Sequence, residues 1–493
     1  MKVLLVSPEY PDTFWSFKHA LRFASKQAGQ PPLGLLTVAS LLPAPWEKRL
    51  VDLNLGPLDP DDLGWADVVF LGGMSVQADS ARKVIRRCNE AGIPVVAGGP
   101  LFTARHREFP DVDHFVLNEA EITLPPFLDD LRNGRPKRLY TTTGWVDMTT
   151  TPLPMWELID PRQYATLNIQ YSRGCPYDCE FCDITVLFGR VPRTKSLGQV
   201  IAEMDAIHRI GWRGHVFFVD DNFIGNRDKL KKEILPGMIR WMEEKGHPFS
   251  LGTEASLNLS DDPVLLDLMV RAGFEEVFVG IESPNVDSLE ECRKTPNKGR
   301  DLIASVHAIQ RAGLQVQGGF IIGFDHDPPS IFDTLIRFIE ESRIVVAMVG
   351  LLNAPVHSRL HGRMEREKRL LETFTGDNTD FTMNLVPRMD PGVLADGYRR
   401  VLRAVYSPRE YYRRVMGFLE THEPPGRHRT PIEFGHLLAL LRSMLLLGVL
   451  AEGRLAYWRL FFWSLLRGPR QFSTAISLAI YGFHFRRVFE LHR

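Results

Sequence analysis

The chain has few cysteines and almost no net charge. Only five of its 493 residues are cysteine, which excludes the disulfide-rich scaffold of a small secreted protein. Its 59 basic and 60 acidic residues leave a formal net charge of -1, so the composition gives no support for a nucleic acid or another polyanion as the partner. Hydrophobic residues make up 44% of the chain, as in folded globular proteins, and the length suggests about three domains.

The sequence also has little that resembles a leader or a membrane span. Residues 1–8 contain one lysine and a short apolar run, which predicts a first strand and not a signal peptide. Residues 434–451 are mostly apolar, but Arg442 stands at their centre, which argues against a membrane-spanning helix. We therefore expect a cytoplasmic protein.

The neutral total conceals a basic C-terminal region. From Pro391 to Arg493 there are 16 basic and 7 acidic residues, so the rest of the chain is acidic. Aromatic residues and arginines are interleaved in residues 454–466, a composition that suits a hydrophobic substrate with a polar or anionic end. Two alternatives are open for this region: association with a membrane surface, or a helical cap on the preceding domain with its arginines in water.

Three of the five cysteines, Cys175, Cys179 and Cys182, lie within eight residues directly after a predicted strand. Thiolates are soft ligands that suit zinc or an iron–sulfur cluster. Zinc would need a fourth cysteine or histidine, and none follows closely. Three ligands leave one coordination position open, which indicates chemistry and not a structural metal site. Cys88 and Cys292 stand alone and are expected to be bystanders.

Short apolar runs alternate with helical stretches in two series. The first series, in residues 1–140, predicts a doubly wound parallel sheet, and the Thr- and Pro-rich residues 141–160 form a linker. The second series, in residues 161–355, has six strand–helix repeats, which predicts a partial barrel because a full eightfold barrel needs about 250 residues. Residues 356–493 are mostly helical. The expected fold class is α/β: a Rossmann-like sheet, a partial (β/α)6 TIM-type barrel and a C-terminal helical domain.

Polar residues and glycines follow the predicted barrel strands at their carboxyl ends, where the active groups of such barrels lie. Carboxylates there can accept hydrogen bonds from a ribose diol or an ammonium group. Glycines let a ligand approach the backbone closely. The candidates for cofactor binding are Asp220, Asp221, Asn222, Glu254, Ser256, Glu282, Gly319 and Gly323.

Together with the spacing Cys-x3-Cys-x-Phe-Cys, these segments resemble the radical S-adenosylmethionine enzymes. The resemblance implies that the three cysteines bind a 4Fe–4S cluster and that Phe181 lies near the adenine of S-adenosylmethionine. The acidic segment 220–222 would meet the methionine end, although the usual Gly-Gly-Glu is replaced there. Reduction by an external electron donor would then cleave the sulfonium and release a 5′-deoxyadenosyl radical.

Residues 1–140 resemble the cobalamin-binding domain of one subgroup of these enzymes, whose ligand lies beyond the carboxyl ends of the strands. One segment departs from the pattern. Residues 8–15 replace the Asp-x-His-x-x-Gly loop that supplies a lower axial imidazole to cobalt. The resulting hypothesis is that cobalt lacks a protein imidazole, and a spectrum of histidine-ligated cobalamin would refute it. The resemblance implies cobalamin contacts at Ser75, Gly98, Gly99 and Glu119.

The C-terminal region resembles that of a subgroup that includes hopanoid 2-position methylases. Together the resemblances imply a methyltransferase that acts on an unactivated carbon of a hydrophobic lipid or natural product. Two alternatives stay open. Cobalamin could assist a radical cyclisation, rearrangement or carbon–carbon coupling without methyl transfer, or the protein could be a cobalamin or redox sensor. Glu254 and Glu282 argue against a sensor, which would not need a site for ribose and an amino acid.

Overall fold

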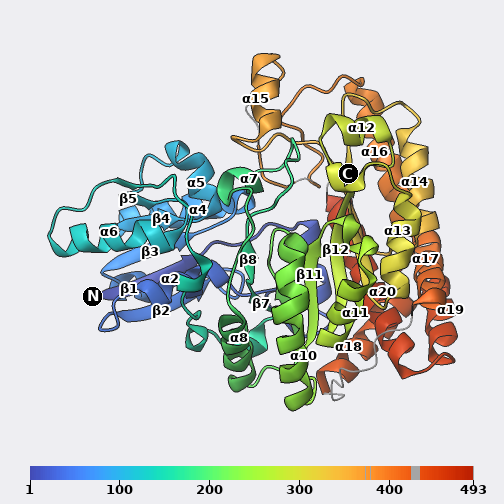
Figure 1. Ribbon diagram of the computed structural model, residues 1–493, viewed down its shortest axis with the longest axis horizontal. Helices are drawn as coiled ribbons and strands as arrows, with labels where there is room; N and C mark the ends of the chain where they lie inside the picture. Colours follow the sequence, from blue (N-terminus) through green and yellow to red (C-terminus); the bar gives the residue numbers. More distant parts are fainter. Residues whose placement is uncertain (372–373, 378, 423–433, 492–493) are drawn as a thin grey trace.

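The computed structural model describes residues 1–371, 374–377, 379–422 and 434–491. Two six-stranded parallel sheets form its body. In Figure 1 the N-terminal sheet lies at the left, the second sheet lies in the centre, and helices of the C-terminal region cover the right side. This arrangement confirms the expected fold class.

The N-terminal sheet has the strand order β2-β1-β3-β4-β5-β6. Val3, Leu4, Leu5 and Val6 of the second strand in this order are fully buried, because helices cover both faces of a doubly wound sheet. The strands are β1 (Lys2–Ser7), β2 (Glu47–Asp52), β3 (Val68–Gly72), β4 (Val95–Gly98), β5 (His114–Val116) and β6 (Leu139–Tyr140). The helices are α1 (Lys18–Leu21), α2 (Leu33–Leu41), α3 (Pro60–Trp65), α4 (Ala78–Glu90), α5 (Pro100–Arg105) and α6 (Ala120–Arg132).

The second sheet has the order β14-β13-β12-β11-β10-β7, with all neighbours parallel, as a partial barrel requires. Its strands are β7 (Leu167–Ile169), β10 (His215–Phe218), β11 (Ser250–Ala255), β12 (Phe274–Glu282), β13 (Gln315–Ile322) and β14 (Ala347–Leu351). The helices between them are α8 (Leu197–Arg209), α9 (Arg227–Lys229), α10 (Leu235–Glu244), α11 (Pro263–Ala272), α12 (Val286–Glu291), α13 (Leu302–Arg311) and α14 (Ile331–Ser342).

A small hairpin lies between β7 and β10 along the chain. Its strands β8 (Ser172–Arg173) and β9 (Arg193–Thr194) pair antiparallel, and α7 (Ile184–Leu187) lies between them. The three clustered cysteines fall inside this hairpin. The preceding linker packs onto α8, because the side-chain amide of Gln199 donates to the backbone oxygens of Met148 and Thr151, both at 3.1 Å.

The C-terminal helices share one hydrophobic core with the second sheet and with a few residues that follow β1. The ring of Phe14, in the loop after β1, stacks on Phe485 of the last helix with 4.0 Å between centroids. Arg442 donates to the backbone oxygens of Arg22 and Phe23, so it fastens the loop after α1. None of the helices in the described ranges combines the length and hydrophobicity of a membrane span. The helices are α15 (Arg359–Arg366), α16 (Pro391–Tyr406), α17 (Pro408–Thr421), α18 (Phe434–Leu445), α19 (Arg454–Leu465) and α20 (Pro469–Leu491).

Candidate functional site

The three clustered cysteines lie on the loop between β8 and α7. Gly174 opens this loop with a φ of +93°, and a Cβ there would come within 3.0 Å of the backbone oxygens of Phe188 and Gly189, so the tight turn requires glycine. The N–H of Cys175 donates to the oxygen of Gly189 at 3.2 Å. The N–H of Cys182 donates to the backbone oxygen of Cys179 at 3.1 Å. The backbone therefore folds the three cysteines into one short loop.

The three thiols suit a 4Fe–4S cluster, which binds its thiolate ligands through different iron atoms. Within the part of the chain that the structure describes, no three His, Cys, Asp or Glu side chains converge as one metal ion requires. Burial raises the pKa of the Cys179 thiol to about 11, so a bound metal is needed to hold the sulfur as a thiolate.

The first two acidic residues after β10 support the cysteine loop. The carboxylate of Asp220 accepts hydrogen bonds from the backbone N–H groups of Tyr171 and Ser172. The carboxylate of Asp221 accepts one from the N–H of Gly174 at 2.8 Å. Both side chains are thus bonded to the chain that leads into the cysteines. Their predicted contact with the methionine end of a cofactor stays a prediction.

Asn222 and Ser256 meet between the ends of β10 and β11. The N–H of Ser256 donates to Oδ1 of Asn222 at 3.2 Å, and Nδ2 of Asn222 lies 3.3 Å from the Ser256 hydroxyl. The same Nδ2 lies 3.9 Å from the sulfur of Cys175. Asn258 continues the network to the hydroxyl of Tyr177, at 2.7 Å. These bonds bring two predicted site residues to the cysteine loop.

Glu254 completes a group of acidic side chains beside the cysteines. Burial raises the pKa of Asp220 to about 7 and that of Asp221 to about 6. Burial and the charges of Asp221 and Asp220 together raise the pKa of Glu254 to about 8. Three carboxyl groups that repel one another in this way would be stabilised by a cation, such as an ammonium or sulfonium group.

Glu282 ends β12 in the left-handed region, with a φ of +66°. Its carboxylate accepts a hydrogen bond from the ammonium of Lys294 at 2.6 Å. Burial disfavours that ammonium, but the charges of Glu282, Cys179 and Cys182 raise the pKa of Lys294 above its usual value. Sequence reasoning missed Lys294, because no local pattern connects a residue after α12 with the end of β12.

The two glycines predicted on β13 have different surroundings. Gly323 follows the strand with a φ of +106°, and a Cβ there would lie 3.2 Å from the methyl group of Met383. The ring of Phe181 lies beside Phe324, with 6.3 Å between centroids, so Phe181 and Gly323 come together. A Cβ on Gly319 would lie only 2.7 Å from the ring of Phe278. Gly319 therefore makes room for an aromatic side chain.

The candidates in the N-terminal domain lie at the carboxyl edge of its sheet. Ser75 follows β3, and Gly98 ends β4, where a Cβ would lie 2.6 Å from the backbone oxygen of Val116. Gly99 has a φ of +88°. A Cβ on Gly376, from the C-terminal region, would lie 2.9 Å from the Cβ of Ser75. The C-terminal region therefore covers part of this edge, and the predicted cobalamin contacts stay predictions.

Glu119, which follows β5, bonds mainly to residues beyond the N-terminal sheet. One of its oxygens pairs with Arg173 at 3.0 Å and with Arg193 at 2.9 Å. The other accepts the N–H of Val146 at 2.9 Å. Arg173 directly precedes the cysteine loop and also pairs with Glu121 at 2.8 Å. Glu119 thus joins the N-terminal domain to the cysteine loop, and a role in cofactor binding stays a prediction.

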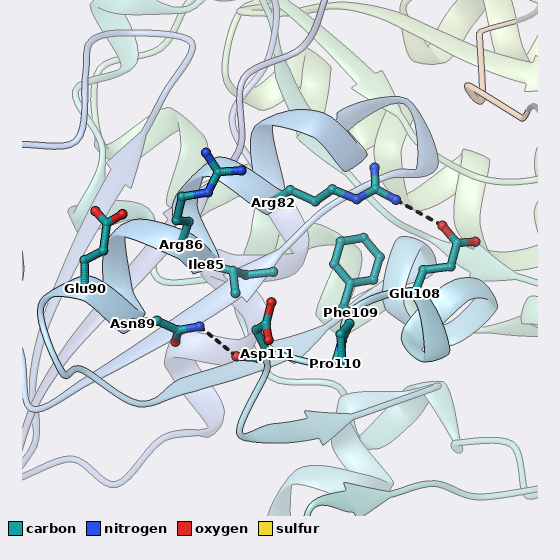
Figure 2. A pocket seen from close by; sticks show the side chains of 9 residues that line it. All are labelled: Arg82, Ile85, Arg86, Asn89, Glu90, Glu108, Phe109, Pro110 and Asp111. Atoms are coloured by element: carbon teal, nitrogen blue, oxygen red, sulfur yellow. Dashed lines mark hydrogen bonds and ion pairs between the residues drawn. The ribbon is translucent and has the colours of Figure 1, made fainter.

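A hollow on the N-terminal domain lies away from these residues. Figure 2 shows that it is formed by α4 and the segment 108–111, with Arg82 paired to Glu108 at 3.1 Å. Asn89 and Asp111 stand before β4 and β5, so this part of the hollow lies at the amino edge of the sheet. The rule that ligands of such sheets bind at the carboxyl edge gives it no role in the site.

Comparison with known proteins identifies the family. Residues 169–339 match the radical SAM superfamily, and residues 358–493 match a domain of unknown function, DUF4070. An uncharacterized methyltransferase of Synechocystis sp. is 38% identical, over 100% of this chain and 93% of its own length. The hopanoid C-2 methylase of Rhodopseudomonas palustris is 38% identical, over 78% of this chain and 73% of its own length.

A solved structure shows the same fold. It is the radical S-adenosylmethionine methyltransferase TsrM from Kitasatospora setae with cobalamin and a 4Fe–4S cluster bound. The two chains are 14% identical and superpose with a TM-score of 0.62 over 99% of each. The resemblance inferred from the cysteine motif is confirmed by the relatives that span the chain. The protein belongs to the radical S-adenosylmethionine superfamily of enzymes, in the same family as these two methyltransferase relatives.

Proposed function

We propose that the protein is a cobalamin-dependent methyltransferase that adds a methyl group to an unactivated carbon of a hydrophobic substrate. The names of the two relatives support methyl transfer. The cysteine loop and the glycines at the edge of the N-terminal sheet support a cluster and a cobalamin, respectively. When bound, these groups and S-adenosylmethionine supply a radical that abstracts hydrogen and the methyl group that replaces it.

One observation supports the hydrophobic substrate: an apolar strip lies beside the acidic group of the second sheet. Glu254 and Phe278 are register partners on β11 and β12, so their side chains share one face. Gly319 and Met348 are partners on β13 and β14, and the contact between Gly319 and Phe278 places them on that face too. The ring of Trp15 meets Phe278 edge-on at 5.2 Å, and its N–H points to the sulfur of Met348 at 3.0 Å.

Trp15 connects the two halves of the proposed site. It follows β1, at the edge of the N-terminal sheet where the predicted cobalamin contacts lie, and it reaches the face that carries Glu254. The Trp15 side chain is still 41% exposed. An exposed indole among apolar side chains can hold an apolar substrate and exclude water from its reacting carbon. Cys175, Cys179 and Cys182 would hold the cluster.

The test is anaerobic reconstitution with iron, sulfide and hydroxocobalamin, followed by incubation with a one-electron reductant, methyl-labelled S-adenosylmethionine and lipid extracts. We expect 5′-deoxyadenosine, S-adenosylhomocysteine and a labelled product heavier by one methyl group. The Cys179→Ala variant should give no 5′-deoxyadenosine. A product without the label would favour cyclisation or rearrangement, and an intact cluster without cleavage of S-adenosylmethionine would favour a sensor.

The Trp15→Ala variant tests the substrate strip. Because misplacement of a reacting carbon by about 1 Å can cost about 100-fold in rate, we expect a loss of methylated product of that order. Release of 5′-deoxyadenosine should continue, since Trp15 contacts Phe278 and Met348 and not the cysteines. Trp65→Ala is the matched control, because Trp65 ends α3 and packs under Arg49 at 4.1 Å. Equal loss of both products in the Trp15 variant would place the residue in the fold and not in the site.

A further inference from the structure

Large apolar side chains are concentrated on one part of the surface. Of the 22 that are exposed in the described residues, nine lie within residues 437–466. This segment comprises α18, the π-helical turn Leu446–Leu450 that continues it, and α19. An apolar area of this density on a folded domain marks an interaction surface. The nine are Leu437, Leu441, Leu445, Val449, Leu450, Leu455, Phe462, Leu465 and Leu466.

The exposed residues of α18 and the following turn form one stripe. Leu437, Leu441, Leu445 and Val449 recur every four residues, which places them along one side of the helix. Between 49% and 54% of each residue is exposed. The inner side of α18 packs against the rest of the protein. There the hydroxyl of Ser443 forms a hydrogen bond of 2.8 Å with the hydroxyl of the buried Tyr457.

The exposed residues of α19 continue the surface. Leu455, Phe462 and Leu466 are spaced by seven and four residues, which again selects one side of a helix. Leu455 is 82% exposed and Leu466 is 88% exposed, which means that almost nothing in the chain covers them. The turn 451–453 joins the two segments, with Leu450 directly before it and Leu455 at the start of α19.

Charge decides which partner suits this surface. Between Phe434 and Arg470 there are five arginines and one acidic residue, Glu452. Arg454, Arg459 and Arg467 are exposed on or next to α19, and Arg467 lies over the ring of Trp463 at 4.2 Å. An apolar stripe bordered by arginine and tryptophan fits the boundary of a bilayer with anionic headgroups. A second copy would instead bring arginines against arginines, which opposes association.

We propose that α18, the turn after it and α19 form a docking surface for an anionic lipid bilayer. The two helices would lie along the bilayer, with the leucines and Phe462 among the acyl chains and the arginines at the headgroups. None of these residues belongs to the cysteine loop, the acidic group or the Trp15 strip. The inference is therefore independent of the proposed function.

The experiment is co-sedimentation of the full chain with vesicles of phosphatidylcholine alone or with phosphatidylglycerol added. We expect the protein to bind the anionic vesicles more tightly, and we expect about 0.5 M salt to weaken this preference because it screens the arginines. The double variant Leu455→Glu and Leu466→Glu should bind at least about 10-fold less, because two buried leucines are lost from the bilayer. Arg459→Glu with Arg467→Glu should remove the preference for anionic vesicles.

The control is the double variant Val264→Glu and Val286→Glu, since these residues are 61% and 62% exposed on α11 and α12. It should bind vesicles as the unaltered protein does. All variants should keep their thermal unfolding midpoint and their cleavage of S-adenosylmethionine. Absence of vesicle binding by the unaltered protein would overturn the proposal. So would a dimer in light scattering that the leucine variant converts to a monomer, because the occupant would then be a second copy.

Discussion

Two ion-pair clusters hold the cysteine loop, one from each flanking region. We call the first the N-terminal clamp: Glu119, Glu121, Arg173 and Arg193. The second, the C-terminal clamp, consists of Glu180, Glu291, Asp325, Arg363 and Arg369. The first joins the N-terminal domain to the start of the loop, and the second joins α15 of the C-terminal region to its middle. The carboxylate side chains of both clamps are at most 14% exposed, but their arginines are distributed differently.

The N-terminal clamp depends on one arginine. Arg173 is 11% exposed and faces both Glu119, 1% exposed, and Glu121, 5% exposed. Without Arg173, Glu119 would keep Arg193 and the backbone N–H of Val146. Glu121 would keep the hydroxyl of Thr151, at 3.1 Å. A neutral hydroxyl does not balance a buried carboxylate charge, so this clamp has little redundancy.

The C-terminal clamp shares its charges among more partners. Arg363 binds both oxygens of Glu180, at 2.9 and 3.0 Å, and Glu180 stands between Cys179 and Phe181. Arg363 also binds Glu291 and Asp325. Two clusters with similar bonds can therefore have different roles. The N-terminal clamp should contribute most to the free energy of unfolding, and the C-terminal clamp should hold the cysteine loop in place around bound iron.

The largest effect is expected for Arg173→Met. Removal of one partner from a buried ion pair leaves an uncompensated charge, which costs about 3–5 kcal/mol in the free energy of unfolding. Chemical denaturation of the purified protein measures this loss. The control is Arg162→Met, because Arg162 is 88% exposed where it pairs with Asp160 and should cost less than about 1 kcal/mol. If the two variants lose equal stability, the N-terminal clamp does not have the role assigned to it.

The fold was largely predictable from local patterns. The run Val345–Leu352 is a continuous apolar or small-residue segment and contains the buried strand β14, and Gln315–Ile322, which is apolar or glycine after two glutamines, forms β13. Such patterns predict six parallel strands without knowledge of their partners. The ends of strands are harder to predict. The apolar run predicts a strand over His215–Asp220, but β10 ends at Phe218, because the carboxylate of Asp220 accepts a hydrogen bond from the N–H of Tyr171.

The site was predictable only in part. The cysteine spacing is local, so it could be recognised directly. Arg173 and Glu119 are 54 residues apart, and Arg363 and Glu180 are 183 residues apart. Pairs at such separations leave no periodic trace in one sequence. Glu119 was therefore predicted as a cobalamin contact, whereas its bonds in the structure are to two arginines and a backbone N–H.

A smaller loss of stability, with an effect on the cluster, is expected for Arg363→Met. Asp325 would keep Arg369 and Glu291 would keep His326, whereas Glu180, whose side chain is 14% exposed, would lose Arg363 and turn to solvent. The cost should therefore be about 1–3 kcal/mol. Because Glu180 lies inside the cysteine motif, the loosened loop should release iron to a chelator about 10-fold faster in the reconstituted protein. Arg366→Met, on the exposed side of α15, is the control. Iron release at the unaltered rate would mean that Arg363 only joins two domains.

The smallest loss of stability is expected for Arg388→Ala. The pH dependence of stability should distinguish this variant from Arg369→Met. Arg388 is 63% exposed and lies 3.4 Å from Asp325, so its loss should cost at most about 0.5 kcal/mol. Burial would raise the pKa of Asp325, but Arg369 and Arg363 hold it below the usual value. A lowered pKa stabilises the fold above the unfolded-state pKa, and this contribution disappears as the pH falls through the folded-state value.

Arg369→Met removes one of the two arginines that lower the pKa of Asp325. The stability of this variant should therefore begin to fall at a higher pH than that of the unaltered protein. Arg388→Ala should lose stability at the same pH as the unaltered protein. Urea denaturation between about pH 3 and pH 7 spans the unfolded-state pKa of an aspartate and compares the three proteins. If Arg388→Ala behaved like Arg369→Met, an exposed arginine would contribute as much as a buried one. The stability of the C-terminal clamp would then depend on the number of arginines around Asp325 and not on how deeply each arginine is buried.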